Sequence, residues 1–245
     1  MTIGRVHSIE TASTHDGPGM RYVVFMQGCK MRCLYCHNRD TWDISGGKPY
    51  KLSTLIDEIC QLKHFYMPNQ GGLTATGGEP LLQASFITKL FQHTQALGLT
   101  TCLDTSGFAD VNSAEIQGVL QHTDLVLLDI KHMQDQAHRE LTGVSNKATL
   151  AFARYLNSCN IPMIIRYVVL PSINDNKQQL EQLALFLTSL DNVVSIELLP
   201  YHEMGKYKWQ HLNKHYVLSH LKPPSLAHMK SCQSLLNNYS LNVVI

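Results

Sequence analysis

Three cysteines lie close together in the chain, at Cys29, Cys33 and Cys36, in the spacing C-x3-C-x2-C. This spacing can bring three thiolates together in one loop around a metal centre. Cysteine thiolates hold iron–sulfur clusters, usually four to a cluster, so three nearby ligands would leave one iron open to another molecule. Structural zinc sites also use clustered cysteines but close the fourth position with a protein ligand, for which His37 is the nearest candidate. Buried cysteines without a metal are a third interpretation, and the spacing favours iron–sulfur.

The composition restricts the class of protein. The 245 residues include 20 Lys and Arg against 19 Asp and Glu, a formal net charge of +1, which argues against a nucleic-acid-binding or membrane-binding surface. No apolar run approaches the thickness of a bilayer, and the N-terminus lacks a signal peptide. Seven cysteines, an odd number, without a secretion signal indicate a reducing, cytoplasmic compartment. We expect a single domain over residues 1–245, acting as a monomer.

Apolar runs alternate with segments of helical periodicity along most of the chain. The expected strands are 22–27, 72–76, 100–103, 125–128, 163–169 and 193–199. The expected helices are 53–64, with Ser53 as its N-cap, 85–97, 113–122, 150–157, 177–190 and 225–238. Six strand–helix units of this kind predict an α/β fold with a parallel sheet and right-handed crossovers.

Polar residues mark the ends of these strands. Four strands end in Gly77-Gly78-Glu79, in Asp104, in Asp129 with Lys131, and in His202, and Arg166 lies inside a fifth. An open doubly wound sheet concentrates its ligand at one switch point, whereas a barrel recruits residues from most strand ends around one mouth. We therefore predict a partial (β/α)6 TIM-like barrel, with these residues and the cysteine loop at its mouth.

Each of these residues also has a plain structural interpretation. A glycine pair such as Gly77-Gly78 is common in a strand-to-helix turn. The carboxylates of Asp104 and Asp129 either bind an amine or a cation or cap turns. Lys131 is placed to form an ion pair with Asp129, and Arg166 needs a partner because an unpaired buried cation is costly.

The cysteine loop resembles the CxxxCxxC motif of the radical S-adenosylmethionine (radical SAM) enzymes, and Gly77-Gly78-Glu79-Pro80 resembles their Gly-Gly-Glu element. The similarity extends over essentially the whole chain to the glycyl-radical-enzyme activases. Between Trp42 and Gly71 the chain has only Cys60, which indicates the type without a ferredoxin-like insert. The further motifs that carry the resemblance are Thr14-x-Asp16-Gly17-Pro18-Gly19-x-Arg21, Tyr35-Cys36-His37-Asn38, Asp104-Thr105-Ser106-Gly107, Asp129-Ile130-Lys131 and His202-x-x-Gly205-x-x-Lys208.

This resemblance implies an enzyme that uses a [4Fe-4S] cluster and S-adenosylmethionine to form a glycyl radical on a partner protein. It implies that Cys29, Cys33 and Cys36 ligate three irons and that the open iron binds S-adenosylmethionine. The implied partner is pyruvate formate-lyase, whose glycine loop enters the barrel mouth, and a flavodoxin or a ferredoxin-type protein is the implied reductant. We expect no protein general base, because the radical itself removes the hydrogen.

The resemblance also assigns roles to individual residues. Asp16 is expected to contact the partner's peptide. A monovalent cation is expected at Asp104, Thr105 and Asp129, where it would offset two buried carboxylates. Contacts to S-adenosylmethionine are expected from Tyr35, Cys36, His37, Gly78, Asp129, Ile130, Lys131, Arg166 and His202.

Two other functions compete with this one. A radical SAM enzyme acting on a small molecule would share the cysteine loop but not the complete set of Thr-x-Asp-Gly-Pro-Gly and His-x-x-Gly-x-x-Lys motifs. An electron-transfer or zinc-binding protein would use the cysteines without catalysis. Iron and sulfide analysis distinguishes these, because stoichiometric zinc in a colourless protein would exclude the enzyme.

Overall fold

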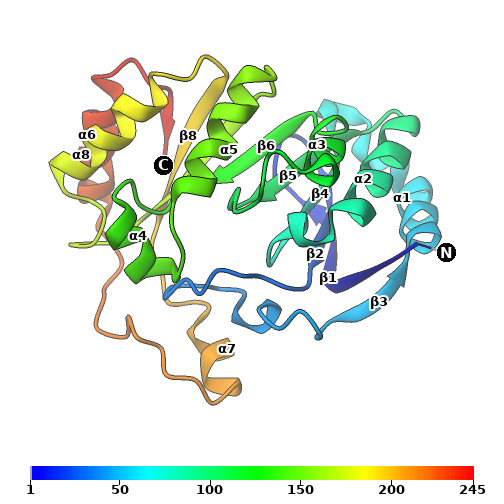
Figure 1. Cartoon of the computed structure of the whole chain (residues 1–245), viewed down its shortest axis with the longest axis horizontal. Helices are drawn as coiled ribbons and strands as arrows, with labels where there is room; N and C mark the ends of the chain where they lie inside the picture. Colours follow the sequence, from blue (N-terminus) through cyan, green and yellow to red (C-terminus); the bar gives the residue numbers. More distant parts are fainter. Residues whose placement is uncertain (1) are drawn as a thin grey trace. The chain divides into compact units, whose positions relative to one another are not determined.

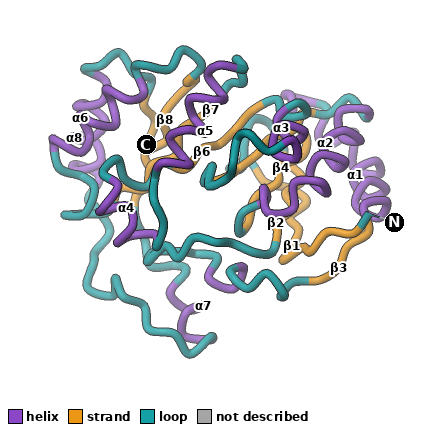
Figure 2. The backbone as a smooth tube through the Cα atoms, in the orientation of Figure 1, coloured by secondary structure: helices purple, strands orange, loops and turns teal. Residues whose placement is uncertain are grey.

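The structure, a computed structural model, describes residues 2–245, apart from the side chain at position 69, and divides them into two compact units (Figure 1). The first unit contains the chain up to Lys30 together with Thr41–Leu127, and the second contains Met31–Asp40 and Leu128–Ile245. In both units helices and strands alternate along the chain (Figure 2). That residues 1–245 act as a single domain stays a prediction.

The first unit is built on five strands in the order β3-β1-β2-β4-β5. β2 pairs in parallel with β4, and β4 with β5, whereas β1 is antiparallel to both β2 and β3. The strands are β1 (Ile3–Ser13), β2 (Arg21–Met26), β3 (Lys48–Lys51), β4 (Gly72–Gly77) and β5 (Thr100–Thr105); the helices are α1 (Leu52–Tyr66), α2 (Ala84–Ala96) and α3 (Ala114–Leu120). Short 3-10 turns lie at Arg39–Thr41, Pro68–Gln70 and Pro80–Gln83.

In the central strands of this unit one face is apolar, whereas the other carries Thr74 and Thr76 of β4. Val24, Leu73 and Leu103 are fully buried. The helices contribute residues at helical spacing, including Leu55 and Ile59 of α1, which are also fully buried. This packing fixes the carboxyl ends of β2, β4 and β5, where the polar motifs begin.

In the second unit the strand order is β6-β7-β8-β9, with the boundary between the units falling inside β6 (Leu125–Asp129). β7 (Met163–Val169) pairs in parallel with β8 (Val193–Pro200), and β8 with β9 (Val243–Val244). The helices are α4 (Asp135–Thr142), α5 (Lys147–Ser158), α6 (Lys177–Leu187), α7 (Lys206–His211) and α8 (Leu226–Asn237).

All six predicted strands and all six predicted helices are present. The predicted strands pair in parallel, β2 with β4, β4 with β5, and β7 with β8. The prediction of Ser53 as an N-cap is wrong, because α1 already begins at Leu52. Sequence patterns also missed β1, β3, β9, α4 and α7. β1 has bulges that shift its register, which removes strict alternation, and α4 and α7 are short and carry few apolar residues.

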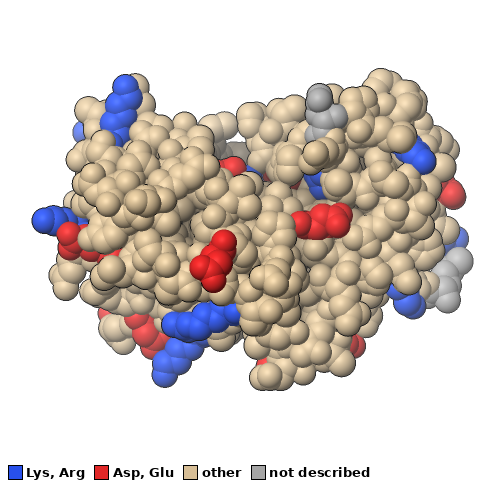
Figure 3. Space-filling view, turned by 90° about the horizontal axis from the view of Figure 1, so that it is seen from above, with Lys and Arg blue, Asp and Glu red and all other residues tan. Residues whose placement is uncertain are grey.

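No helix within residues 2–245 is long and apolar enough to cross a membrane. Charged side chains of both signs are scattered over the face drawn in Figure 3, and most of that face is uncharged.

His132, between β6 and α4, is fully buried and held as the neutral ring by its partners. Its Nδ1 accepts a hydrogen bond from the Gln134 amide at 3.0 Å, and its Nε2 donates to the Ile173 carbonyl at 3.3 Å. Burial lowers the pKa of His132 below its ordinary 6.5. A proton on Nδ1 would face the Gln134 N–H, so the folded state resists protonation.

Acidification should therefore destabilise the protein. The unfolded chain binds the proton more readily than the folded one. The contribution of His132 to the free energy of unfolding is therefore fully present above the pKa of the unfolded state and decreases as the pH falls, by at most about 1.4 kcal/mol per pH unit. Denaturant titrations at about pH 7 and about pH 5 measure this loss. His132→Asn, whose side-chain oxygen can accept from the Gln134 amide, should show a smaller loss; an unchanged pH dependence would contradict the assignment.

Candidate active site

In the first unit the Gly-Gly-Glu motif is hydrogen-bonded to the start of the cysteine loop. The Gly78 amide donates to the Met26 carbonyl at 2.9 Å, and the Glu79 amide donates to the Gly28 carbonyl at 2.8 Å. The Gly28 amide in turn donates to the Thr41 carbonyl at 2.7 Å. These bonds fix the chain just before Cys29, whose own amide lies 3.4 Å from the Trp42 carbonyl.

Gly78 has no room for a side chain. A Cβ atom at this position would lie 2.2 Å from the Gly28 carbonyl oxygen and 2.8 Å from the Gly28 carbonyl carbon. Backbone atoms cannot move aside as a flexible side chain can, so only glycine allows these two segments to approach. Close approach explains this glycine without a ligand, and the predicted contact of Gly78 with S-adenosylmethionine stays a prediction.

Gly78→Ala should lower both stability and activity. The methyl group would push the motif away from the start of the cysteine loop, at a cost of about 1–3 kcal/mol for overpacking. Thermal unfolding and glycyl-radical formation measure the two effects. Gly118→Ala is the matched control: its Cβ has 3.5 Å to its nearest neighbour, inside α3, so it should be neutral or stabilising. Equal behaviour of the two variants would contradict the packing argument.

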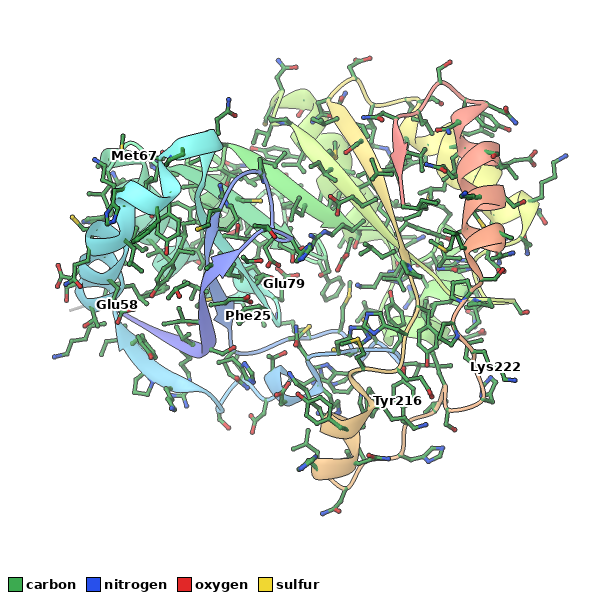
Figure 4. The ribbon with its side chains drawn as sticks, turned by 180° about the vertical axis from the view of Figure 1, so that it is seen from behind. Phe25, Glu58, Met67, Glu79, Tyr216 and Lys222 are labelled. Carbon is green, nitrogen blue, oxygen red and sulfur yellow. The ribbon has the colours of Figure 1, made fainter. Side chains whose placement is uncertain are left out.

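Glu79 points into the protein and organises the end of β5 (Figure 4). Its carboxylate accepts hydrogen bonds from the hydroxyls of Thr105 at 2.6 Å and Ser106 at 2.5 Å, and from the amides of Ser106 at 3.1 Å and Leu81 at 3.2 Å. Burial raises the pKa of Glu79, and these donors oppose that rise. Glu79 is thus a positioning residue, which joins the Gly-Gly-Glu motif to the Asp104-Thr105-Ser106 motif.

The predicted cation ligands of this unit already have partners. Asp104 accepts a hydrogen bond from the Thr76 hydroxyl at 2.6 Å, and the Thr105 hydroxyl donates to Glu79. A cation at Asp104, Thr105 and Asp129 therefore stays a prediction.

The Thr14–Arg21 loop is held by polar contacts that are buried or partly buried. The Asp16 carboxylate accepts from the Ser13 hydroxyl at 2.5 Å, and the Asp16 carbonyl accepts from the Thr74 hydroxyl at 2.6 Å. The Arg21 side chain, 1% exposed, donates to the Thr74 hydroxyl at 3.0 Å and to the Thr100 hydroxyl at 2.6 Å. The loop is therefore preformed, as its glycine and proline content predicts.

In the second unit the cysteine loop is anchored on α4 and α7. The Arg32 amide donates to the Thr142 carbonyl at 2.7 Å, and the Cys36 amide donates to the Cys33 carbonyl at 3.1 Å. The indole of Trp209 donates to the Cys36 carbonyl at 2.9 Å. Trp209 was not among the predicted site residues, because no local pattern connects α7 with a loop more than 170 positions earlier.

Tyr35, Asp129 and Lys131 form one polar cluster in this unit. Lys131 Nζ lies 2.9 Å from an Asp129 carboxylate oxygen and 5.6 Å from the centre of the Tyr35 ring. Burial alone would lower the pKa of Lys131, but the Asp129 carboxylate raises it, so Lys131 is a cation at neutral pH. The ion pair predicted as the structural alternative is present. Ile130, between the two, is buried, and its amide donates to the Arg166 carbonyl at 3.1 Å.

The Tyr35 hydroxyl can still donate and accept hydrogen bonds. It is buried, and it has no hydrogen-bond partner among the described residues. Such an atom is costly in a protein interior unless a ligand or a water satisfies it. This fits the predicted contact of Tyr35 with S-adenosylmethionine.

The two histidines of the predicted site meet in the second unit. The rings of His37 and His202 have centres 4.2 Å apart, and His37 Nε2 donates to the His202 carbonyl at 3.1 Å. Burial lowers the pKa of His37, so this ring is neutral at pH 7. A Cβ at Gly205 would lie 2.6 Å from the His37 Cα, which explains the glycine of this motif. Lys208 completes the motif through an ion pair with Asp40 at 3.1 Å.

Arg166 has the partner that its burial requires. Its Nε lies 3.0 Å from a Glu197 carboxylate oxygen, and the two residues are paired in register across β7 and β8. Glu197 was missed because its position in a predicted strand carries no local signal. Binding of S-adenosylmethionine by Arg166 stays a prediction.

No group of three or more His, Cys, Asp or Glu side chains within residues 2–245 is close enough together to hold a single metal ion. The residues that fit a [4Fe-4S] cluster are the three cysteines of the loop, by the chemistry of their thiols and by their spacing. Cys33 is buried, and Cys29 and Cys36 are partly exposed.

Comparisons with known proteins agree with this site. Residues 15–150 match the family described as a 4Fe-4S single cluster domain. The chain is 46% identical to the pyruvate formate-lyase 1-activating enzyme of Escherichia coli strain K12, over 99% of this chain and 98% of that protein.

Solved structures show the same fold. A domain of the pyruvate-formate lyase-activating enzyme of Bacteroides vulgatus is 27% identical with a TM-score of 0.60, covering 71% of this chain and 98% of that domain. A radical SAM methyltransferase from Sphaerobacter thermophilus, 15% identical, has a TM-score of 0.64 over 91% of this chain and 65% of that chain, and supports the fold alone. These matches confirm the prediction of a partial TIM-like barrel, the fold of the radical SAM enzymes.

A match at this identity over nearly the full length establishes the family. This chain belongs to the pyruvate formate-lyase activating enzymes, radical SAM enzymes that use a [4Fe-4S] cluster and S-adenosylmethionine.

Proposed function

We propose that this protein activates pyruvate formate-lyase by forming a glycyl radical on it under anaerobic conditions. The observation that carries the proposal is the full-length match to activating enzymes, together with a loop that offers three cysteines and no fourth. When bound, the cluster supplies one electron that splits S-adenosylmethionine, and the resulting 5′-deoxyadenosyl radical removes hydrogen from a glycine of the partner.

The chain's own residues bind and orient these groups. We propose that Cys29, Cys33 and Cys36 are the cluster ligands. In the second unit the Tyr35 hydroxyl and the Lys131 ammonium offer hydrogen bonds to polar groups of S-adenosylmethionine. Roles in the same binding are proposed for Cys36, His37, Gly78, Asp129, Ile130, Arg166 and His202.

Three further aspects belong to the proposal. A small electron-carrier protein of the flavodoxin or ferredoxin type is the reductant, because the cluster must receive one electron in each cycle. The protein works as a monomer. It works in the cytoplasm, where thiols stay reduced and available to iron.

The decisive experiment is anaerobic. Reconstituted protein, a chemical reductant, S-adenosylmethionine and purified pyruvate formate-lyase are combined and examined by electron paramagnetic resonance. A glycyl doublet on the partner is the expected result. Formation of 5′-deoxyadenosine without the doublet would retain the chemistry but reject the partner.

Asp16→Ala tests the proposed contact with the partner's peptide. The variant should form at least about ten times less glycyl radical on intact pyruvate formate-lyase, since it would lose a hydrogen bond from a charged group to the peptide, worth about 1.4 kcal/mol or more. Cleavage of S-adenosylmethionine without the partner should persist. Ser13→Ala, which removes only the hydroxyl that donates to Asp16, is the control for loop structure. Loss of both reactions in Asp16→Ala would contradict a role confined to the peptide.

A further inference from the structure

The charges of this chain are segregated along the sequence. Residues 204–245 contain five lysines and no Asp or Glu, whereas residues 1–203 contain the other 15 basic residues and all 19 acidic ones. Three histidines lie between 204 and 222, at 211, 215 and 220. A near-neutral protein with such an asymmetry has a local positive surface available to an acidic partner.

The same segment exposes apolar side chains. Met204 is 76% exposed, Tyr207 55%, Val217 45% and Leu212 42%. Lys214 and Lys222 are exposed among them, while Lys206 pairs with Glu203 and Lys208 with Asp40. Exposed apolar groups rimmed by charge mark protein interaction sites, and Tyr and Met are enriched in such interfaces. We call the exposed side chains of residues 204–222 the α7 surface.

The α7 surface is held rigidly by its inner side. Trp209 packs edge-on against Tyr216, with ring centres 5.5 Å apart, and the Tyr216 and Tyr201 hydroxyls are 3.0 Å apart. Figure 4 shows Tyr216 beside α7 and Lys222 further along the segment that follows it. A preformed surface of this kind loses little entropy when a partner binds.

The inner side of α7 rests directly on the cysteine loop. Trp209 donates its indole hydrogen to the Cys36 carbonyl at 2.9 Å, and Lys208 reaches Asn38 and Asp40 of the same loop. A protein lying on the outer face of α7 would be separated from this loop by one helix diameter, about 10 Å.

We propose that the α7 surface is the docking site for a small acidic one-electron carrier protein, which reduces the cluster from there. This inference rests on the proposed function, which requires one electron for each cleavage of S-adenosylmethionine. In the step the carrier loses one electron and the oxidised cluster gains it, and no covalent bond forms or breaks. Positive charge at Lys214 and Lys222 attracts the carrier, and the apolar side chains make the close contact.

The composition favours a protein over a nucleic acid as the occupant. Residues 204–245 contain no arginine, the side chain that most often binds phosphates and bases through bidentate hydrogen bonds. Only two lysines of the α7 surface are exposed and outside an ion pair in the described structure, whereas nucleic-acid binding rests on many phosphate contacts.

The test uses the reconstituted holoenzyme with Lys214→Glu and Lys222→Glu combined. Its matched control combines Lys48→Glu and Lys51→Glu, which reverse two exposed lysines of β3 in the other unit. Reduced flavodoxin is the carrier, and the rate of cluster reduction is followed by visible absorbance at several ionic strengths. The α7 variant should be reduced at least about ten times more slowly at low salt and lose most of its salt dependence, and the control should match the unaltered protein.

Reduction by dithionite separates this inference from the proposed function. With dithionite, the α7 variant should form the glycyl radical as fast as the unaltered protein. If the unaltered protein forms none with dithionite, the proposed function fails. If both variants accept electrons from flavodoxin equally well, the docking site is overturned. It is likewise overturned if the α7 variant loses only affinity for a single-stranded oligonucleotide.

Discussion

Cys33→Ser should abolish the iron–sulfur cluster and with it the glycyl-radical activity. Iron in such clusters is held by soft thiolates, and a serine hydroxyl is a hard ligand that stays protonated at neutral pH. Replacing a residue that only hydrogen-bonds to a metal ligand already costs about 10–100-fold in metal affinity or activity. Loss of a ligand itself should therefore cost more than about 100-fold. Iron and sulfide content, visible absorbance and the glycyl doublet measure the effect.

Cys60→Ser is the matched control for this substitution. Cys60 is exposed on α1, outside the loop, and its replacement should leave iron content and activity unchanged. The fold of Cys33→Ser should persist, because the Cys36 amide binds the backbone carbonyl of residue 33 and not its side chain. Retention of a full cluster by Cys33→Ser would refute the assignment of the three ligands.

Glu79→Leu should destabilise the protein by about 3–5 kcal/mol, because the hydroxyls of Thr105 and Ser106 and the Ser106 amide would all lose their acceptor. A loss of this size is a large part of the usual stability of a domain. Activity should fall as well, since Glu79 joins two motifs of the site. Denaturant unfolding followed by circular dichroism, and radical formation at a temperature where the variant is folded, measure both effects.

Glu79→Gln provides the sharper comparison. It keeps the volume and one acceptor oxygen but places an amide group opposite the Ser106 N–H, so about 1–3 kcal/mol should be lost. Burial raises the pKa of Glu79 above its ordinary 4.5. The unaltered protein is therefore most stable, relative to this variant, below pH 4.5, and the difference shrinks as the pH rises through the folded-state pKa. A difference that grows with pH, or Glu79→Leu within 1 kcal/mol of the unaltered protein, would contradict the role.

Much of the fold could be predicted from local patterns. The strand at 163–169 is an apolar run apart from Arg166, and α6 begins at a capping box of Asn176 and Gln179, a purely local signal. β1 could not be predicted, because its pairing with β2 is irregular in register and its other partner, β3, lies more than 30 positions further along the chain. α4 and α7 could not be predicted either, because both are short and carry few apolar residues.

The candidate site divides in the same way. The three cysteines, Gly78, the Asp129–Lys131 pair and His202 were singled out from residue types and their places in the chain, and the His202–Lys208 motif from the family resemblance. Three other features could not be found in this way: the inward direction of Glu79, the pairing of Arg166 with Glu197, and the contact of Trp209 with Cys36. Those three depend on which segments the fold brings together, and short-range patterns carry no information about that.

The sequence by itself determined that three thiols lie in one loop, because the number and spacing of cysteines are covalent properties of the chain, and it predicts that one ligand position of a four-iron cluster is left to another molecule. Only the tertiary structure decided what holds that loop. In the first unit it is the Gly28–Gly78 approach, and in the second it is α4 and α7. Backbone hydrogen bonds and close packing between distant segments exist only in the folded chain, and so does the contact of Trp209 with the Cys36 carbonyl.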